Sequence, residues 1–142
     1  MILIDVNILV YAKRHDSPNH SLFRTWLEET FRSDSIVGIS DLVLSSVVRV
    51  LTHPQIFGKP DHLDEALEYV NSLRDQPECI LVSPGGRHWE IFIRLCKAAG
   101  AKGNLVSDAY FAALAIESGA EWITTDRDFS RFPGLRWRHP LS

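Results

Sequence analysis

Cysteine is scarce in this sequence, and glycine-rich nucleotide-binding motifs are missing. The two cysteines, Cys79 and Cys96, form no C-x-x-C pair, which argues against a disulfide framework or a zinc ribbon. No G-x-x-x-x-G-K-[ST] or G-x-G-x-x-G run occurs, so nothing indicates a P-loop or a dinucleotide-binding loop. With 142 residues, of which 45% are apolar, the chain is long enough to bury a core without disulfide or metal staples. We therefore expect one globular domain over residues 1–142.

Long hydrophobic runs are also missing. No stretch approaches the roughly 18 consecutive apolar residues of a membrane-spanning helix. The apolar start, residues 1–12, carries Asp5 and lacks the basic leader and small-residue cleavage pattern of a signal peptide. We expect a soluble, cytoplasmic protein with reduced thiols and no contact with a membrane.

The sequence has no large excess of either charge. A net charge of −3 argues against a protein that coats nucleic acid by bulk charge alone. Near the end of the chain, however, four arginines lie close together among aromatic residues: Arg127, Arg131, Arg136 and Arg138. Because arginines are common on any protein surface, we interpret this end as a solvated, amphipathic segment rather than a polyanion contact.

Short apolar runs alternate with segments of helical periodicity along the whole chain. The expected strands cover residues 2–5, 36–39, 80–82, 122–125 and 135–138. The expected helices cover residues 7–12, a segment after Ser17-Pro18, about 40–52 with Ser40 as N-cap, 61–75 with Asp61 as N-cap, 87–99, and 105–118 closed by Gly119. Continuous apolar strands that alternate with helices predict an α/β fold, in which a parallel sheet of four to five strands is covered by helices on both faces.

Helical spacing also predicts which side chains face the core. In the segment 61–75 the expected inner face is Leu63, Ala66, Leu67, Val70 and Leu73. In the segment 87–99 the expected inner face is Trp89, Phe92, Ile93 and Cys96.

Three aspartates occupy positions at which parallel folds bind ligands. Asp5 ends the first strand, Asp126 follows the fourth, and Asp108 lies in the first turn of the alanine-rich helix. A single aspartate there is explained as a helix cap. Three together are not, because each like-charged pair at about 4 Å costs on the order of 4 kcal/mol at an effective dielectric constant near 20. Such a cluster takes up protons or holds a cation, and a set of oxygen ligands favours Mg²⁺ or Mn²⁺ over Zn²⁺.

Three segments carry a family resemblance. Residues 2–12 resemble the opening of the PIN-domain ribonucleases, and residues 106–115 are similar to their third acidic motif. Residues 124–129, followed by 132–135, resemble the closing segment of the VapC toxins in that family. The resemblance implies an endoribonuclease that depends on Mg²⁺ or Mn²⁺ and belongs to a type II toxin-antitoxin system. It also implies a homodimer whose activity on RNA is blocked by a cognate VapB-type antitoxin.

By position, the resemblance also assigns site residues. It makes Asp5 and Asp108 the principal metal ligands, Asp126 the fourth acidic position and Asn7 its polar companion. At the second acidic position, where the family commonly has Glu, this sequence has Ser46. Either Asp41 or Asp128 then supplies the missing charge, or the metal is held more weakly.

Two other functions remain open. An aspartyl phosphotransferase also carries D-x-D after its first strand, but here the second acid is replaced by Asn7. A catalytically weakened PIN-like module that binds RNA or an antitoxin would explain Ser46.

Overall fold

Strands and helices alternate along the chain, as the sequence predicts. The structure is a computed structural model that describes all residues from 1 to 142. The elements in order are β1 (Ile2–Ile4), α1 (Val6–Lys13), α2 (His20–Arg32), β2 (Val37–Ile39), α3 (Asp41–Leu51), α4 (Leu63–Arg74), β3 (Cys79–Leu81), α5 (His88–Ala99), α6 (Asn104–Ser118), β4 (Glu121–Ile123), the 3-10 helix η1 (Arg127–Arg131) and β5 (Trp137–Arg138). None of the helices is both long and apolar enough to cross a membrane.

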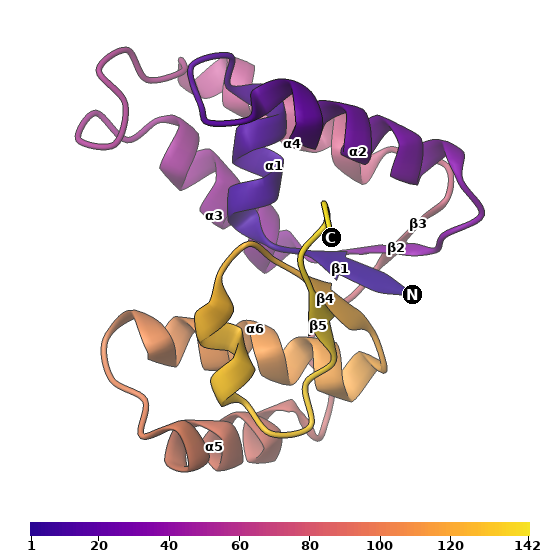
Figure 1. Cartoon of the computed structure of the whole chain (residues 1–142), viewed down its shortest axis with the longest axis vertical. Helices are drawn as coiled ribbons and strands as arrows, with labels where there is room; N and C mark the ends of the chain where they lie inside the picture. The colour runs from indigo at the N-terminus through magenta and orange to yellow at the C-terminus, as the bar shows by residue number, and fades with distance from the viewer.

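The five strands form one sheet in the order β3-β2-β1-β4-β5, and every neighbouring pair is parallel. β1 lies in the middle, with Ile2 opposite Val37 of β2 and Leu3 opposite Trp122 of β4. Figure 1 shows α1 to α4 on one side of the sheet and α5 and α6 on the other. The predicted α/β architecture with a parallel sheet of five strands is therefore confirmed.

The middle of the sheet and α6 carry much of the core. Leu3 and Trp122, from adjacent strands, are almost completely buried. Four alanines of α6 are almost completely buried, and their small side chains let the helix backbone approach its neighbours closely: Ala109, Ala112, Ala113 and Ala115. Gly119 ends α6 with a left-handed backbone (φ 71°), which glycine adopts without strain.

The face of α5 that packs on the core differs from the predicted one. His88, Ile91 and Leu95 are buried, whereas Trp89 is 63% exposed and Ile93 is also exposed. The Nε2 atom of the buried His88 ring lies 2.9 Å from the carbonyl oxygen of Tyr110. This hydrogen bond gives the polar ring a partner inside the α5–α6 interface. The prediction was wrong for Trp89 and Ile93, whereas Phe92 and Cys96 are partly buried against the core. The reason is that α5 has apolar residues on two adjoining faces, and periodicity alone does not say which one α6 covers.

Two expectations for α4 are also corrected. Its N-cap is His62, while Asp61 lies before the helix and binds Arg14 and Lys13, each at 2.8 Å. These two cations hold the segment between α3 and α4 against α1. The inner face of α4 contains Ala66, Val70 and Leu73 as predicted, but Leu63 and Leu67 are exposed beside it.

Candidate active site

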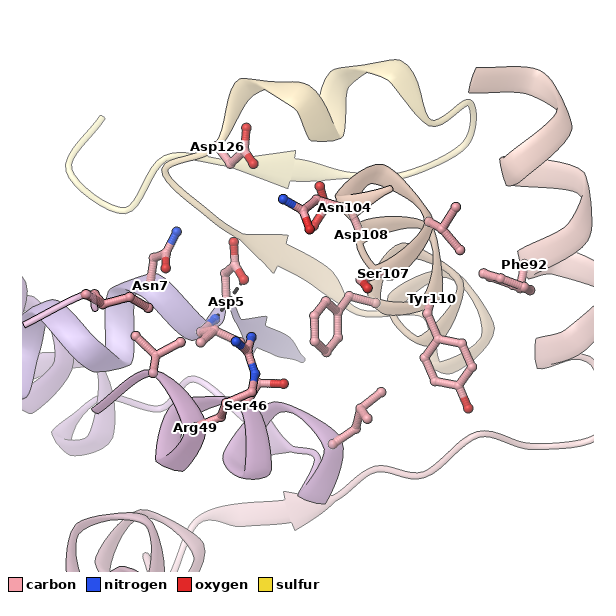
Figure 2. Close-up of a pocket in the computed structure, with 16 residues that line it drawn as sticks. Asp5, Asn7, Ser46, Arg49, Phe92, Asn104, Ser107, Asp108, Tyr110 and Asp126 are labelled. Carbon is pink, nitrogen blue, oxygen red and sulfur yellow. Dashed lines mark hydrogen bonds between the residues drawn. The ribbon is translucent and has the colours of Figure 1, made fainter. Parts of the chain in front are cut away.

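The order of the strands predicts a ligand-binding crevice at the carboxyl ends of β1 and β4. The chain runs from β1 outward to β2 and β3 on one side, and then returns to place β4 on the other side of β1. In such sheets, ligands bind outside the carboxyl ends of the two strands at which the direction switches. A cleft of about 840 Å³ lies there, between α3 on one side and α5 and α6 on the other (Figure 2).

Asp5 lies at the end of β1, where the strand turns directly into α1. Its backbone is extended, and its Oδ1 caps the helix by accepting a hydrogen bond from the Val6 N–H at 2.7 Å. Its Oδ2 accepts a hydrogen bond from the hydroxyl of Thr124 at 2.6 Å. Burial raises the pKa of Asp5 to about 6, against the lowering effect of these two hydrogen bonds and with a smaller contribution from the charge of Asp126.

Thr124 joins the ends of β1 and β4. Its buried hydroxyl donates to Asp5 and accepts a hydrogen bond from the backbone N–H of Asp126 at 3.0 Å. Asp126 in turn caps η1, with its Oδ1 accepting from the N–H of Asp128 at 2.9 Å. Thr124 therefore fixes the position of one carboxylate and the backbone of the next.

Asp108 reaches the cleft from α6. The sequence predicts Asp108 in the first turn of the helix. It lies in the second turn, because α6 begins at Asn104 after Gly103. Partial burial, together with the charges of Asp126, Asp5 and Asp128, raises the pKa of Asp108 to about 6. Burial is the larger cause of both shifts, and the smaller contributions from neighbouring aspartates indicate that the carboxylates are close enough to repel one another.

The predicted convergence of Asp5, Asp108 and Asp126 on one rim is confirmed, since all three line the cleft (Figure 2). Two of them also cap helices, so the capping and site interpretations of these residues are compatible. No group of three His, Cys, Asp or Glu side chains is placed so that all three could hold one metal ion. An open rim of carboxylate oxygens fits Mg²⁺ or Mn²⁺, because such ions keep several waters and are usually held by only one or two protein carboxylates.

Ser46 occupies the second acidic position of the family resemblance, and the side of α3 that carries Ser46 faces the cleft. Asp41 does not replace the missing charge, because it lies outside the cleft lining and is paired with Arg74 at 2.9 Å. Asp128 also lies outside the lining, but its charge contributes to the raised pKa of Asp108. Of the two predicted substitutes, Asp128 is the one that acts on the site.

Three polar residues of the cleft are not predicted from the sequence: Arg49, Asn104 and Ser107. The predicted Asn7 also lines the cleft and is exposed. Helical spacing is the signal that indicates the unpredicted residues, because Arg49 follows Ser46 by one turn and Asn104 precedes Asp108 by one turn. Arg49 is the one basic residue among those that line the cleft.

Three of the four arginines near the end of the chain have structural roles outside the cleft, and Arg127 is exposed outside the cleft lining. Arg131 donates to the carbonyl oxygen of Ala99 at 2.9 Å, where α5 ends, and Arg136 donates to that of Gly119 at 2.8 Å, where α6 ends. Arg138 pairs with Glu121 at 2.9 Å. Arginines at helix C-termini satisfy free carbonyl groups, which agrees with their interpretation as a solvated end of the chain.

Comparison with known proteins gives the same fold and a family. The family model of the PIN domain matches residues 2–135. The chain is 41% identical over 141 residues to Ribonuclease VapC43 of Mycobacterium tuberculosis, covering 99% of this chain and 96% of that protein. It is 37% identical over 140 residues to Ribonuclease VapC25 of the same species, covering 99% of both chains.

Solved structures of lower identity share the fold. A chain of VapBC2 from Rickettsia felis, bound to a DNA fragment from its promoter, has a TM-score of 0.70 at 22% identity, with 98% of both chains covered. A chain of VapBC-1 from nontypeable Haemophilus influenzae has a TM-score of 0.69 at 17% identity, with 100% of both chains covered. The acidic cleft at the β1–β4 switch, the match over residues 2–135 and the full-length relatives together show that this chain belongs to the PIN-domain family and, within it, to the VapC group.

Proposed function

We propose that the chain is an endoribonuclease that depends on Mg²⁺ or Mn²⁺ and acts as the toxin of a type II toxin-antitoxin pair. The observation that carries the proposal is the convergence of Asp5, Asp108 and Asp126, from three different elements, on one open cleft. Full-length relatives that are named ribonucleases support RNA as the substrate.

Asp5 and Asp108 are the proposed metal ligands, with Asp126 as the third. A divalent ion, when bound, offsets their mutual repulsion, lowers the pKa of a water molecule and stabilises negative charge on a phosphate that is being cleaved. Asp5 is suited to hold an ion in a fixed place because Val6 and Thr124 fix both of its oxygens. The hydrogen bonds leave lone pairs on these oxygens free for a ligand.

The remaining polar groups have supporting roles in this proposal. Asp128 adds negative charge near Asp108, and Asn7 presents an amide at the mouth of the cleft that orients a water or a phosphate oxygen. Ser46 supplies no charge, so we expect the ion to be held less tightly than by a fully acidic rim.

Cleavage of total RNA by the purified chain, separated from any partner, tests the nuclease proposal. We expect cleavage with Mg²⁺ or Mn²⁺, none with EDTA, and recovery when the divalent ion is restored in excess. An EDTA-treated sample that cleaves as fast as the metal-loaded one would contradict the metal-dependent mechanism.

A second function, a weakened PIN-like module that binds without cutting, is favoured by one observation, the serine at position 46 inside the cleft. Binding of RNA without cleavage at any divalent-ion concentration would identify it. An aspartyl phosphotransferase would instead take a phosphoryl group from a phosphate ester, forming an acyl phosphate on Asp5 and releasing the alcohol. A phosphorylated Asp5 after incubation with phosphate esters would support that alternative.

We further propose that a VapB-type antitoxin is the partner, that the chain forms a homodimer, and that it acts in the cytoplasm. The solved complexes VapBC2 and VapBC-1, which share the fold, support a partner of this kind. An acidic rim also suits inhibition by a basic peptide segment, since Arg or Lys side chains paired with the carboxylates exclude a metal ion.

Expression of the chain alone in a bacterial host tests the toxin proposal. Growth is expected to arrest, because RNA is cleaved with no inhibitor present, and Asp5→Asn is expected to relieve the arrest at an equal protein level. Growth curves with immunoblots of both proteins give the measurement. Normal growth with abundant, folded wild-type protein would contradict the toxin role and leave the nuclease proposal in place.

A further inference from the structure

Arg49 is the feature of the cleft that the metal-ligand proposal leaves without a role. It lies in the last turn of α3 and is exposed, and Figure 2 shows it on the side of the cleft where Asp5 and Ser46 lie. Among the residues lining the cleft it is the only one with a positive charge, against three carboxylates.

The guanidinium of Arg49 has no partner in the protein. It takes part in none of the ion pairs of the chain, although Asp5 lines the same cleft. The charges that shift the pKa of Asp5 and of Asp108 are those of other aspartates, and no arginine contributes. All five N–H donors of the group are therefore available to a ligand.

A purely structural role explains Arg49 only in part. A cation in the last turn of α3 interacts favourably with the C-terminal end of the helix dipole. That effect requires a positive charge anywhere around the last turn. It does not account for a charge placed on the wall of the acidic cleft.

Three of the four arginines near the end of the chain are engaged elsewhere, and the fourth, Arg127, is exposed but lies outside the cleft lining. Arg131 and Arg136 donate to the carbonyl oxygens that end α5 and α6, and Arg138 pairs with Glu121. None of these three lines the cleft. Among the residues that line the cleft, Arg49 is therefore the one cation that an entering polyanion meets.

We propose that Arg49 binds a phosphate of the RNA strand within the active-site cleft and so holds the strand against the acidic rim. This inference rests on the proposed function for RNA as the ligand. A phosphodiester carries one negative charge and two free oxygens, which match the planar fork of a guanidinium. The carboxylate rim alone repels the strand, and Arg49 supplies attraction from the α3 side of the cleft.

Binding of a fluorescein-labelled single-stranded RNA, measured by fluorescence anisotropy with Mg²⁺ present, tests the assignment. The parent protein carries Asp108→Asn so that the probe stays intact. Arg49→Gln keeps length and helix propensity but removes the charge, and we expect its Kd to rise about ten- to a hundred-fold, the range for loss of a charged hydrogen bond. The slope of log Kd against log salt is expected to fall by about 0.7, the contribution of one phosphate contact on a single strand.

Two further variants separate this role from a general effect of charge. Arg49→Lys keeps the charge and the helix-end interaction and should recover part of the affinity. Arg94→Gln removes an arginine on α5 that is also exposed and forms no ion pair but lies outside the cleft lining, and its Kd should stay within about two-fold of the parent. Thermal unfolding of each variant checks that the fold is intact.

The outcomes distinguish this inference from the proposed function. If wild-type protein cleaves RNA but Arg49→Gln binds with the affinity and salt slope of the parent, the assignment of Arg49 is overturned and the nuclease proposal stands. If wild-type protein never cleaves RNA while binding still depends on Arg49, the nuclease proposal fails and the phosphate contact stands. Equal loss of affinity in Arg49→Gln and Arg94→Gln would overturn the specific role of Arg49.

Discussion

Asp5→Asn and Asp108→Asn are each expected to lower the rate of RNA cleavage by more than about a hundred-fold, because each removes a charge that the bound divalent ion requires. Asparagine keeps the size of the side chain, and its carbonyl oxygen can still cap α1 through the Val6 N–H. The loss is therefore expected without loss of the fold. Initial rates at saturating Mg²⁺ and Mn²⁺ give the measurement, and urea unfolding checks stability.

A matched control is Asp34→Asn, which removes an exposed aspartate outside the cleft lining and should leave the cleavage rate unchanged. Asp128→Asn is expected to have a smaller effect than either site variant, because Asp128 acts on Asp108 only through its charge. Wild-type rates for both Asp5→Asn and Asp108→Asn would show that the metal site is assigned to the wrong residues.

The carboxylates of the site were predictable because their positions depend on local sequence. Asp5 comes directly after an apolar run and Asp126 follows the end of β4 by three residues, and parallel strands place such residues at the same edge of the sheet. What the sequence does not contain is the order of the strands. β4 lies beside β1, which brings Thr124 within 2.6 Å of Asp5 across 119 positions of the chain. No periodicity in the sequence indicates that hydrogen bond.

Helix faces were the least predictable part of both the fold and the site. In α5 the residues Trp89 and Ile93 have the same spacing as the buried Ile91 and Leu95, so only the position of α6 decides between the two faces. The same uncertainty applies to Arg49. One turn of α3 separates it from Ser46, but whether that face looks into the cleft depends on the packing of α3 against α1 and α4.

The metal-free protein is expected to lose stability as the pH rises through about 6, because burial raises the pKa of Asp5 from 3.8 to about 6. The folded protein then holds a proton on Asp5 more tightly than the unfolded chain does. The stability contributed by that proton is fully present below pH 3.8 and is lost as the pH rises through the folded pKa. The full difference corresponds to about 3 kcal/mol, of which about 1 kcal/mol lies between pH 5 and pH 7.5.

Urea unfolding in EDTA at several pH values measures this effect, with Asp5→Asn as the reference and Asp34→Asn as the matched control. Asparagine at position 5 changes the hydrogen bond with Thr124, but that change does not depend on pH. The free energy of unfolding of wild-type protein, relative to Asp5→Asn, should therefore fall from pH 5 to pH 7.5, and Asp34→Asn should follow the wild-type curve. Parallel curves for wild type and Asp5→Asn would show that the charge of Asp5 is not desolvated by the fold.

Added Mg²⁺ should reverse the loss at pH 7.5, because a cation bound to the ionised carboxylates stabilises only the folded state. At an ion concentration about a hundred times Kd the expected gain in the free energy of unfolding is about 2.7 kcal/mol. The same addition should leave Asp5→Asn nearly unchanged, since its rim has lost the carboxylate that is fixed on both sides by Val6 and Thr124. Equal stabilisation of wild-type protein and Asp5→Asn by Mg²⁺ would place the ion elsewhere on the protein. This conclusion would not depend on the rates at which the two proteins cleave RNA.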